Sequence, residues 1–208
     1  MLVASGGNEF IANYNDFTYV DPGGKIIAQD ATSVTTSLCT DKQILYGYQD
    51  LGADFIHFNA SGTITIDYDF KMTGGIKNGN HYTGVGNTIA GFQTSLYWSS
   101  GAIFANWGTS VPRLLYGYRG GVFIGSSTPL GLKNTWYYGR VTLTKSTNTY
   151  KLEVFSDAAR TVSLGSISNT STAYPSDGFR YAYVIDNGRN IDAARNVSGI
   201  FANLKITW

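Results

Sequence analysis

The 208-residue sequence contains a single cysteine, Cys39, and this scarcity excludes several kinds of site. One cysteine cannot form an intrachain disulfide, and it cannot build a metal site from paired thiolates. A catalytic cysteine also needs an activating partner such as histidine, and the sequence around Cys39 shows no such arrangement. We therefore interpret Cys39 as a small, half-buried residue of a strand.

Charge is also scarce. Charged residues make up 14% of the chain, and the formal net charge is +1, whereas an average globular protein has roughly 25% charged residues. Phosphate backbones are normally bound by clustered Lys and Arg, and the sequence has no such run. We therefore expect no nucleic-acid partner and no electrostatic attraction to an anionic membrane.

Long apolar runs are missing as well. No stretch approaches the roughly 20 apolar residues of a membrane-spanning helix. The N-terminal sequence MLVASGGNEF has neither the basic start nor the apolar core of a signal peptide. The sequence therefore predicts no membrane span and shows no visible signal peptide.

Aromatic residues, by contrast, reach 14% of the chain, with 15 Tyr and 4 Trp, and alternating patterns recur throughout it. In residues 62–72, Ile64, Ile66, Tyr68 and Phe70 fall on one face, and polar residues, Asp67 and Asp69 among them, fall on the other. This period of two indicates a half-buried strand. Many short strands between Gly, Asn and Asp turns predict an all-β, antiparallel two-sheet β-sandwich in a single domain over residues 1–208. Only the segment near residues 190–196 could form a short helical turn.

The segment NTWYYGRVTLTKSTNTYKLEVFSD (134–157) contains two alternating runs joined by a polar loop over residues 145–149. Five residues are a common hairpin loop. Tyr137, Val141 and Leu143 share one face of the first run, and the second run repeats this face with Tyr150, Leu152 and Val154. Burial of these side chains is enough to explain the hairpin.

The Trp136-Tyr137 start and the "FSD" exit of this hairpin resemble the concanavalin A-like, laminin-G-like family of jelly rolls. The segments YQDLGADFIHFNASGTITIDYDFKM (48–72) and SGIFANLKITW (198–208) are similar to an early pair of strands and to the closing strand of such domains. Together these segments cover a little under a third of the chain, and their style is most similar to domains of phage and environmental origin. The resemblance implies a jelly-roll fold more directly than a function.

The family includes glucanases and lyases, so we considered catalysis. The glucanases carry paired carboxylates on one strand, with one acting as nucleophile and the other as acid. Asp67 and Asp69 share a face, but the chain has only two glutamates, Glu9 and Glu153, and neither stands beside this pair. The Tyr–His chemistry of the lyases has candidates in His57 and His81, without a motif that arranges them. We expect no enzyme, with a glucanase or lyase as the alternative.

Calcium is an open alternative. The segment DNGRNID (186–192) places Asp186, Asn187, Asn190 and Asp192 close together, and Ca²⁺ prefers such oxygen ligands. Lectins and laminin-G-like domains often hold calcium near their binding loops, so the resemblance adds weight to this site. Asp-Asn-Gly is also a common turn sequence. We therefore expect no required cofactor and name Asp186, Asn190 and Asp192 as candidate calcium ligands.

The sequence also contains an echo, LYGYQDLG (45–52) and LYGYRGGV (115–122). Each copy places two tyrosines on one strand face with a glycine between them. Ordinary strand packing explains the echo, and an aromatic shelf for a sugar is the alternative. The candidate glycan contacts are Tyr97, Trp98, Trp107, Tyr116 and Tyr118, each of which packing could also explain.

These observations predict a non-enzymatic, lectin-like surface domain on a virion, such as a phage capsid decoration, fibre or tail protein, with glycan binding. The alternative is a secreted carbohydrate-binding module. The expected location is a virion surface or the extracellular space. The expected partners are a neutral glycan, other virion proteins or further copies of the chain.

Overall fold

The structure is a computed structural model, and it describes most of the chain. Strands β9 to β11 are described by their backbone and pairing. The described residues are 8–21, 23–39, 45–52, 55–58, 62–77, 79–87, 99–104, 113–119, 122–130, 132–170, 178–186 and 196–208.

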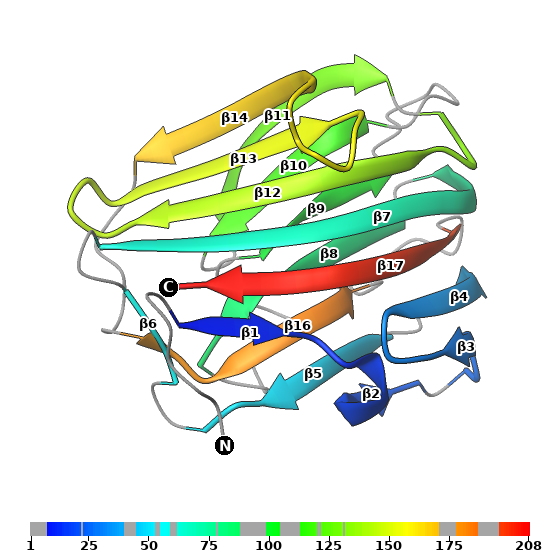
Figure 1. The fold of residues 1–208 in the computed structure, drawn as a ribbon. Helices are drawn as coiled ribbons and strands as arrows, with labels where there is room; N and C mark the ends of the chain where they lie inside the picture. Colours follow the sequence, from blue (N-terminus) through cyan, green and yellow to red (C-terminus); the bar gives the residue numbers. More distant parts are fainter. Residues whose placement is uncertain are drawn as a thin grey trace.

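One layer of the fold is an eight-stranded antiparallel sheet (Figure 1). Its central strands are β7 (Thr63–Lys77) and β17 (Asn196–Thr207), and β1 (Glu9–Ile11) also pairs with β17. Its strands in order are β14 (Ser163–Thr170), β13 (Thr149–Phe155), β12 (Trp136–Thr144), β7, β17, β4 (Ser33–Cys39) and β3 (Ile26–Gln29).

The second layer is a seven-stranded antiparallel sheet, which lies behind the first in Figure 1. Strands β15 (Gly178–Phe179) and β6 (Ile56–His57) form a separate short pair. The seven strands in order are β11 (Val122–Leu130), β10 (Arg113–Arg119), β9 (Ser99–Phe104), β8 (Gly79–Gly86), β16 (Tyr181–Asp186), β5 (Tyr46–Asp50) and β2 (Thr18–Val20). The predicted two-sheet β-sandwich is therefore confirmed.

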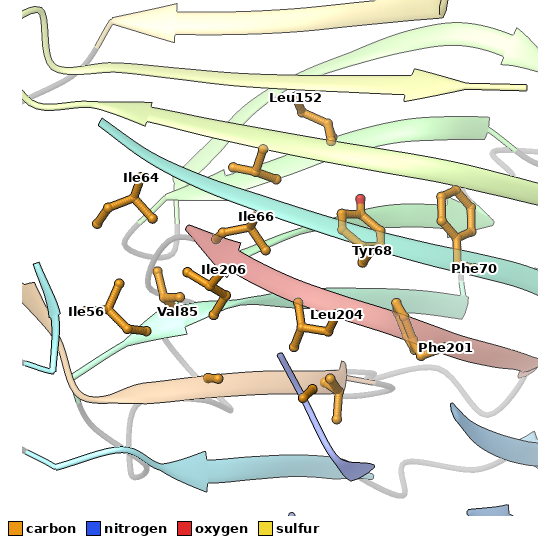
Figure 2. Packing of buried hydrophobic residues seen from close by; sticks show 14 of the residues in the cluster. Ile56, Ile64, Ile66, Tyr68, Phe70, Val85, Leu152, Phe201, Leu204 and Ile206 are labelled. Carbon is orange, nitrogen blue, oxygen red and sulfur yellow. The ribbon is translucent and has the colours of Figure 1, made fainter. Parts of the chain in front are cut away.

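Side chains from both sheets meet in one apolar core. Ile64, Ile66, Tyr68 and Phe70 of β7 are fully buried, as the alternation predicts. Figure 2 shows them beside Phe201, Leu204 and Ile206 of β17, with Val85 of β8 and Ile56 of β6 in the same cluster. Alternation puts one half of each strand into this core and leaves the other half on the outer face of its sheet.

The predicted hairpin is formed by β12 and β13, and its register pairs Val141 with Leu152 and Leu143 with Tyr150. All four side chains are buried, so the predicted inward face is confirmed. Gly139 lies on the same face against the ring of Tyr68, where an added Cβ would be only 2.2 Å from Cζ. The core therefore needs a residue without a side chain at this position.

Strand β17 contains an irregularity. Its register with β7 shifts between Ala202 and Lys205, and Asn203 takes a left-handed φ of 52°. This bulge lets Phe201 and Leu204 both face the core, although they are an odd number of residues apart.

A short 3₁₀ turn, η1 (Tyr14–Asp16), was not predicted. The Asn13 side chain accepts a hydrogen bond from the Asn15 N–H and so caps this turn. The segment near residues 190–196 lies outside the described residues, apart from Asn196, which begins β17. Within the described part of the chain, no helix is long and apolar enough to cross a membrane.

Candidate functional site

The outer face of the eight-stranded sheet carries a network of charged side chains, and Asp67 and Asp69 of β7 lie at its centre. Arg140 of β12 holds Asp67 with two hydrogen bonds, from Nε to Oδ1 at 2.7 Å and from Nη2 to Oδ2 at 2.8 Å. This fork geometry is the strong form of a charged hydrogen bond. The bond to Asp67 also raises the pKa of Arg140.

Arg160 reaches this face from the turn between β13 and β14. Its Nη2 donates to Oδ1 of Asp69 at 2.8 Å and to the Tyr68 carbonyl at 3.3 Å, and its Nε donates to the Gly139 carbonyl at 3.3 Å. Arg160 has a left-handed φ of 56°, a conformation that costs energy for any residue except glycine. One side chain therefore fastens the turn to both β12 and β7.

Asp69 is only 9% exposed, although it lies on the outer face of the sheet. Asn203 donates to its Oδ2 at 2.8 Å, so each of its two oxygens accepts a hydrogen bond from the protein. Burial raises the pKa of Asp69, while Asn203 and Arg160 act in the opposite direction. The two carboxylates are thus engaged by the protein itself and are not presented as a pair to a substrate.

We call this surface the charged face. Its other charges are also matched: Lys151 lies 2.8 Å from Glu153, Lys205 contacts Glu9, and Lys71 lies over the Trp136 ring at 4.9 Å. The charged face consists of Glu9, Asp67, Asp69, Lys71, Arg140, Lys151, Glu153, Arg160 and Lys205.

The outer face of the seven-stranded sheet is different, because tyrosines gather on it. Ala182 and Val184 of β16 belong to the main core, whereas Tyr181 and Tyr183 point to the other side and form a separate cluster with Tyr46. Tyr48 of β5 packs against this cluster, with its ring centroid 6.0 Å from that of Tyr181 in an edge-to-face contact. We call this surface, defined by Tyr46, Tyr48, Tyr181 and Tyr183, the tyrosine face.

Burial raises the pKa of Tyr183, so its phenol stays neutral at all ordinary pH values. Its ring lies over Gly86 of β8, where an added Cβ would be 2.9 Å from Cε2. Tyr48 is half-buried and is the most accessible ring of the four. The tyrosine face therefore combines a rigid, buried aromatic base with one ring that remains open to solvent.

The strand register extends this face toward β10. Directly paired positions of an antiparallel sheet share a face. Across five strands, the paired positions are Tyr48, Tyr183, Gly84, Ser99 and Tyr118. Tyr116 occupies the next position on that face of β10, opposite Gly101 and Ser126.

Both copies of the Tyr-Gly-Tyr echo therefore lie in the seven-stranded sheet, and their tyrosines occupy positions of the same face. Gly47, the glycine of the first copy, faces inward, where an added Cβ would be 2.6 Å from Cε1 of Tyr19. Strand packing thus explains this glycine, while Tyr46 and Tyr48 form part of the outer surface. The two explanations of the echo apply to different residues within it.

An exposed ion pair lies at one end of the tyrosine face. Arg180 donates from Nε to Oδ1 of Asp50 at 2.8 Å and from Nη2 to Oδ2 at 2.6 Å. The Asn87 Oδ1 accepts from the Arg180 N–H at 2.9 Å, and the Asn87 amide donates to the Gly178 carbonyl at 3.0 Å. We call Asp50, Asn87 and Arg180 the Asp50 corner.

The sequence did not identify the Asp50 corner as a site. Asp50 and Arg180 are 130 residues apart, and no motif links them. The only signal was the first copy of the echo, residues 45–52, which contains Asp50.

The remaining sequence candidates stay predictions. Tyr97, Trp98 and Trp107 lie outside the described residues, as do Asn187, Asn190 and Asp192 of the calcium segment. Asp186 ends β16, at the opposite end of that strand from Tyr181. In the described part of the chain, no three His, Cys, Asp or Glu side chains come together as metal ligands.

No protein-family model and no curated protein matches the sequence. Solved structures of lectins do match the fold over nearly the whole chain. Arcelin-5, a lectin-like defence protein from Phaseolus vulgaris, shows 6% identity and a TM-score of 0.56 over 98% of each chain.

Two further lectins show the same relationship. Lectin II from Ulex europaeus gives 8% identity and a TM-score of 0.58, covering 96% of this chain and 97% of its own. The basic winged bean lectin, solved with Tn-antigen, gives 7% identity and a TM-score of 0.60, covering 97% of this chain and 98% of its own. The chain therefore has the concanavalin A-like jelly-roll fold found in legume lectins, as the sequence resemblance implied.

Proposed function

We propose that this protein is a non-enzymatic, lectin-like domain that binds a neutral glycan on its tyrosine face. The observation that carries the proposal is the tyrosine cluster on the outer face of the seven-stranded sheet, with the ring of Tyr48 partly exposed to solvent. Aromatic rings stack on the C–H surfaces of sugars, and nearby polar groups bind the hydroxyls. We add Tyr116 and Tyr118 to the proposed contacts, and the support is that their strand positions share a face with the position of Tyr48 in the register.

The fold supports this proposal. One of the structures that match it is the lectin UEA-II complexed with galactose, at 9% identity and a TM-score of 0.59. Galactose is the ligand of that lectin, and at such low sequence identity the similarity to this chain concerns the fold alone. The low charge of the chain favours an uncharged ligand.

The state of the two β7 carboxylates supports a protein without glycosidase activity. Glycoside hydrolysis needs two carboxyl groups that both face the substrate. Asp67 is held by Arg140, and Asp69 is held by Arg160 and Asn203. We infer that Asp67 and Asp69 stabilise the sheet and do not act on a sugar.

The test is a glycan array of neutral oligosaccharides, followed by calorimetry on each hit. We expect saturable binding that Tyr116→Ala and Tyr118→Ala both weaken. Absence of binding to every glycan would refute the proposed function. Release of reducing sugar from a polysaccharide panel would refute its non-enzymatic part.

We further propose a place on a virion surface or outside the cell, with other virion proteins or copies of this chain as additional partners. The support is the sequence: few charges and many uncharged polar residues. Capsid or tail genes beside the coding sequence would support a virion role, and secretion genes would favour a secreted module. Calcium at Asp186, Asn190 and Asp192 remains part of this proposal, and a calcium titration of glycan affinity would test it.

A further inference from the structure

Three strand ends meet at the Asp50 corner. Strand β5 ends at Asp50, β8 ends at Gly86 just before Asn87, and β16 begins at Tyr181 just after Arg180. The register pairs Tyr181 with both Asp50 and Gly86. Backbone hydrogen bonds from Arg180 N–H to the Gly86 carbonyl at 3.2 Å and from Leu51 N–H to the Arg180 carbonyl at 2.9 Å fix the three ends together. The polar groups of the corner are therefore held on a rigid frame.

The corner keeps free hydrogen-bonding capacity on its exposed side. A carboxylate has about four acceptor positions, and the Asp50 carboxylate uses three of them, for Arg180 Nε, Arg180 Nη2 and the Gly52 N–H. Nη1 of Arg180 has no hydrogen-bond partner among the described residues. The side chains of Arg180 and Asp50 are 44% and 40% exposed. A donor and an acceptor thus stand side by side at the surface, already oriented by their mutual bonds.

Tyr48 adds an apolar surface beside these polar groups. Tyr48 and Asp50 are two residues apart on β5, so they share a face at a spacing of about 7 Å. The Arg180 guanidinium lies over the Tyr181 ring at 5.1 Å, which fixes its orientation, and the half-buried Tyr48 stands at the edge of that ring. One sugar ring is wide enough to cover Tyr48 and to reach the corner.

Resting on the proposed function, we propose that the Asp50 corner is a sugar-binding site that recognises two adjacent hydroxyl groups of a neutral hexose unit stacked on Tyr48. Each hydroxyl both donates and accepts hydrogen bonds. The Arg180 Nη1 group can donate to one hydroxyl, and the remaining Asp50 acceptor position can take the proton of the other.

The corner also sets the charge of the ligand. Its ion pair is electrically neutral, and the Asp50 carboxylate repels a second carboxylate at short range. Arg180 spends two of its donors on Asp50 and is not free to form a fork with an acidic sugar. The site therefore selects a neutral hexose over the corresponding uronic acid.

The experiment uses calorimetry on the full chain with two matched sets of probes. One set contains neutral oligosaccharides of glucose, galactose and mannose, and the other contains oligosaccharides of the corresponding uronic acids. We expect the wild type to bind at least one neutral probe at least tenfold more tightly than its acidic counterpart. We expect Arg180→Lys and Asp50→Asn each to weaken that binding at least tenfold, because each variant keeps the size of the side chain and loses the fork.

A double variant, Lys151→Ala with Glu153→Ala, is the matched control, because it removes an ion pair from the outer face of the other sheet. We expect its affinity to equal that of the wild type. As a second readout, the Arg180 Nε–H resonance of the wild type should shift when the neutral probe is added.

The outcomes separate the two proposals. If the wild type binds a neutral probe and both corner variants bind it equally well, the corner is not the site, although the proposed function stands. An Arg180 resonance that does not move at saturation would overturn the corner in the same way. If the wild type binds no probe of either set, both proposals fail.

Discussion

The outer faces of the two sheets differ in which side chains they carry and in how those side chains are bonded. On the charged face, nine ionised side chains in five strands and one turn bind mainly to each other. On the tyrosine face, the Asp50–Arg180 pair lies at one end, and aromatic rings occupy the centre. A surface that satisfies its own charges stabilises the fold, whereas a surface of fixed rings with spare polar groups is suited to a ligand.

The two faces differ in whether their carboxylates are buried and hydrogen-bonded within the protein or exposed to solvent. Asp69 has its two oxygens occupied by Arg160 and Asn203 and is only 9% exposed. Asp50 is 40% exposed, and Arg180 holds its pKa well below the usual range. The Asp69 carboxylate therefore bonds within the protein, whereas the Asp50 carboxylate is exposed to a ligand.

The largest effect should come from Arg160→Ala. The substitution leaves the Asp69 carboxylate buried without its cationic partner, and breaking such a pair costs about 3 kcal/mol of unfolding free energy. Urea denaturation measures this loss, and glycan binding should be unchanged. Arg160→Gly is the matched control, because glycine relieves the left-handed φ and should recover part of the loss. A loss below about 1 kcal/mol would mean that Asp69 simply becomes hydrated.

The second effect compares one glycine from each sheet. In Gly139→Ala, the new Cβ would lie within 2.6 Å of two ring carbons and the hydroxyl oxygen of the buried Tyr68, and overpacking of this kind costs about 1–3 kcal/mol. In Gly86→Ala, the closest atom is Cε2 of Tyr183 at 2.9 Å, so we expect a smaller loss and weaker glycan binding. Thermal unfolding and calorimetry of both variants would test this order, and the reverse order would contradict the assignment of the two faces.

The third effect is on binding alone. Tyr48→Ala removes the accessible ring of the tyrosine face, and loss of one aromatic contact of about 1.4 kcal/mol corresponds to about tenfold in affinity. Tyr138→Ala is the control, because Tyr138 is also a half-buried tyrosine on an outer face, but on the other sheet. Calorimetry should find its glycan affinity equal to that of the wild type. Equal losses of glycan affinity in both variants would show that the tyrosine face is not the glycan-binding surface.

A smaller effect is expected for the exposed pair of the charged face. Lys151→Ala removes an ion pair in which the Lys151 side chain is 45% exposed, and such pairs contribute less than about 0.5 kcal/mol. The midpoint of urea denaturation should barely move. A loss comparable to that of Arg160→Ala would mean that the network acts as one unit.

No effect is expected when the pH of the glycan-binding assay falls from 7 to about 4. Because the pKa of Asp50 is lowered by Arg180, the carboxylate stays ionised until the pH falls below the usual aspartate value of about 3.9. The ion pair and its contribution to binding are therefore present above that pH and are lost below it. Affinity that instead disappears near pH 6.5 would indicate a histidine in the site.

The sequence predicted what depends on alternation. The inward residues of β7 and the hairpin partners Val141 and Leu152 were correctly placed, because both follow from local periodicity and burial. Pairs between distant segments could not be predicted this way. Arg160 and Asp69 are 91 residues apart, and no pattern at either position indicates the other.

The candidate site was only partly visible for the same reason. Tyr116 and Tyr118 were singled out as aromatics of one strand, but only the register shows that they share a face with Tyr48. The Asp50–Arg180 pair joins strands of distant sequence and left no local trace.

The position of β17 has a consequence for how this chain is made. Its Asn203 closes onto Asp69, 134 residues earlier, and β17 lies between β7 and β4 in the sheet. During synthesis, β7 therefore has only β12 beside it until β17 emerges, and its other edge stays open. Unpaired strand edges invite association with other chains. Pairings this distant in sequence also form slowly. In the newly made chain, the local β12–β13 hairpin therefore covers one edge of β7 until β17 pairs with the other edge.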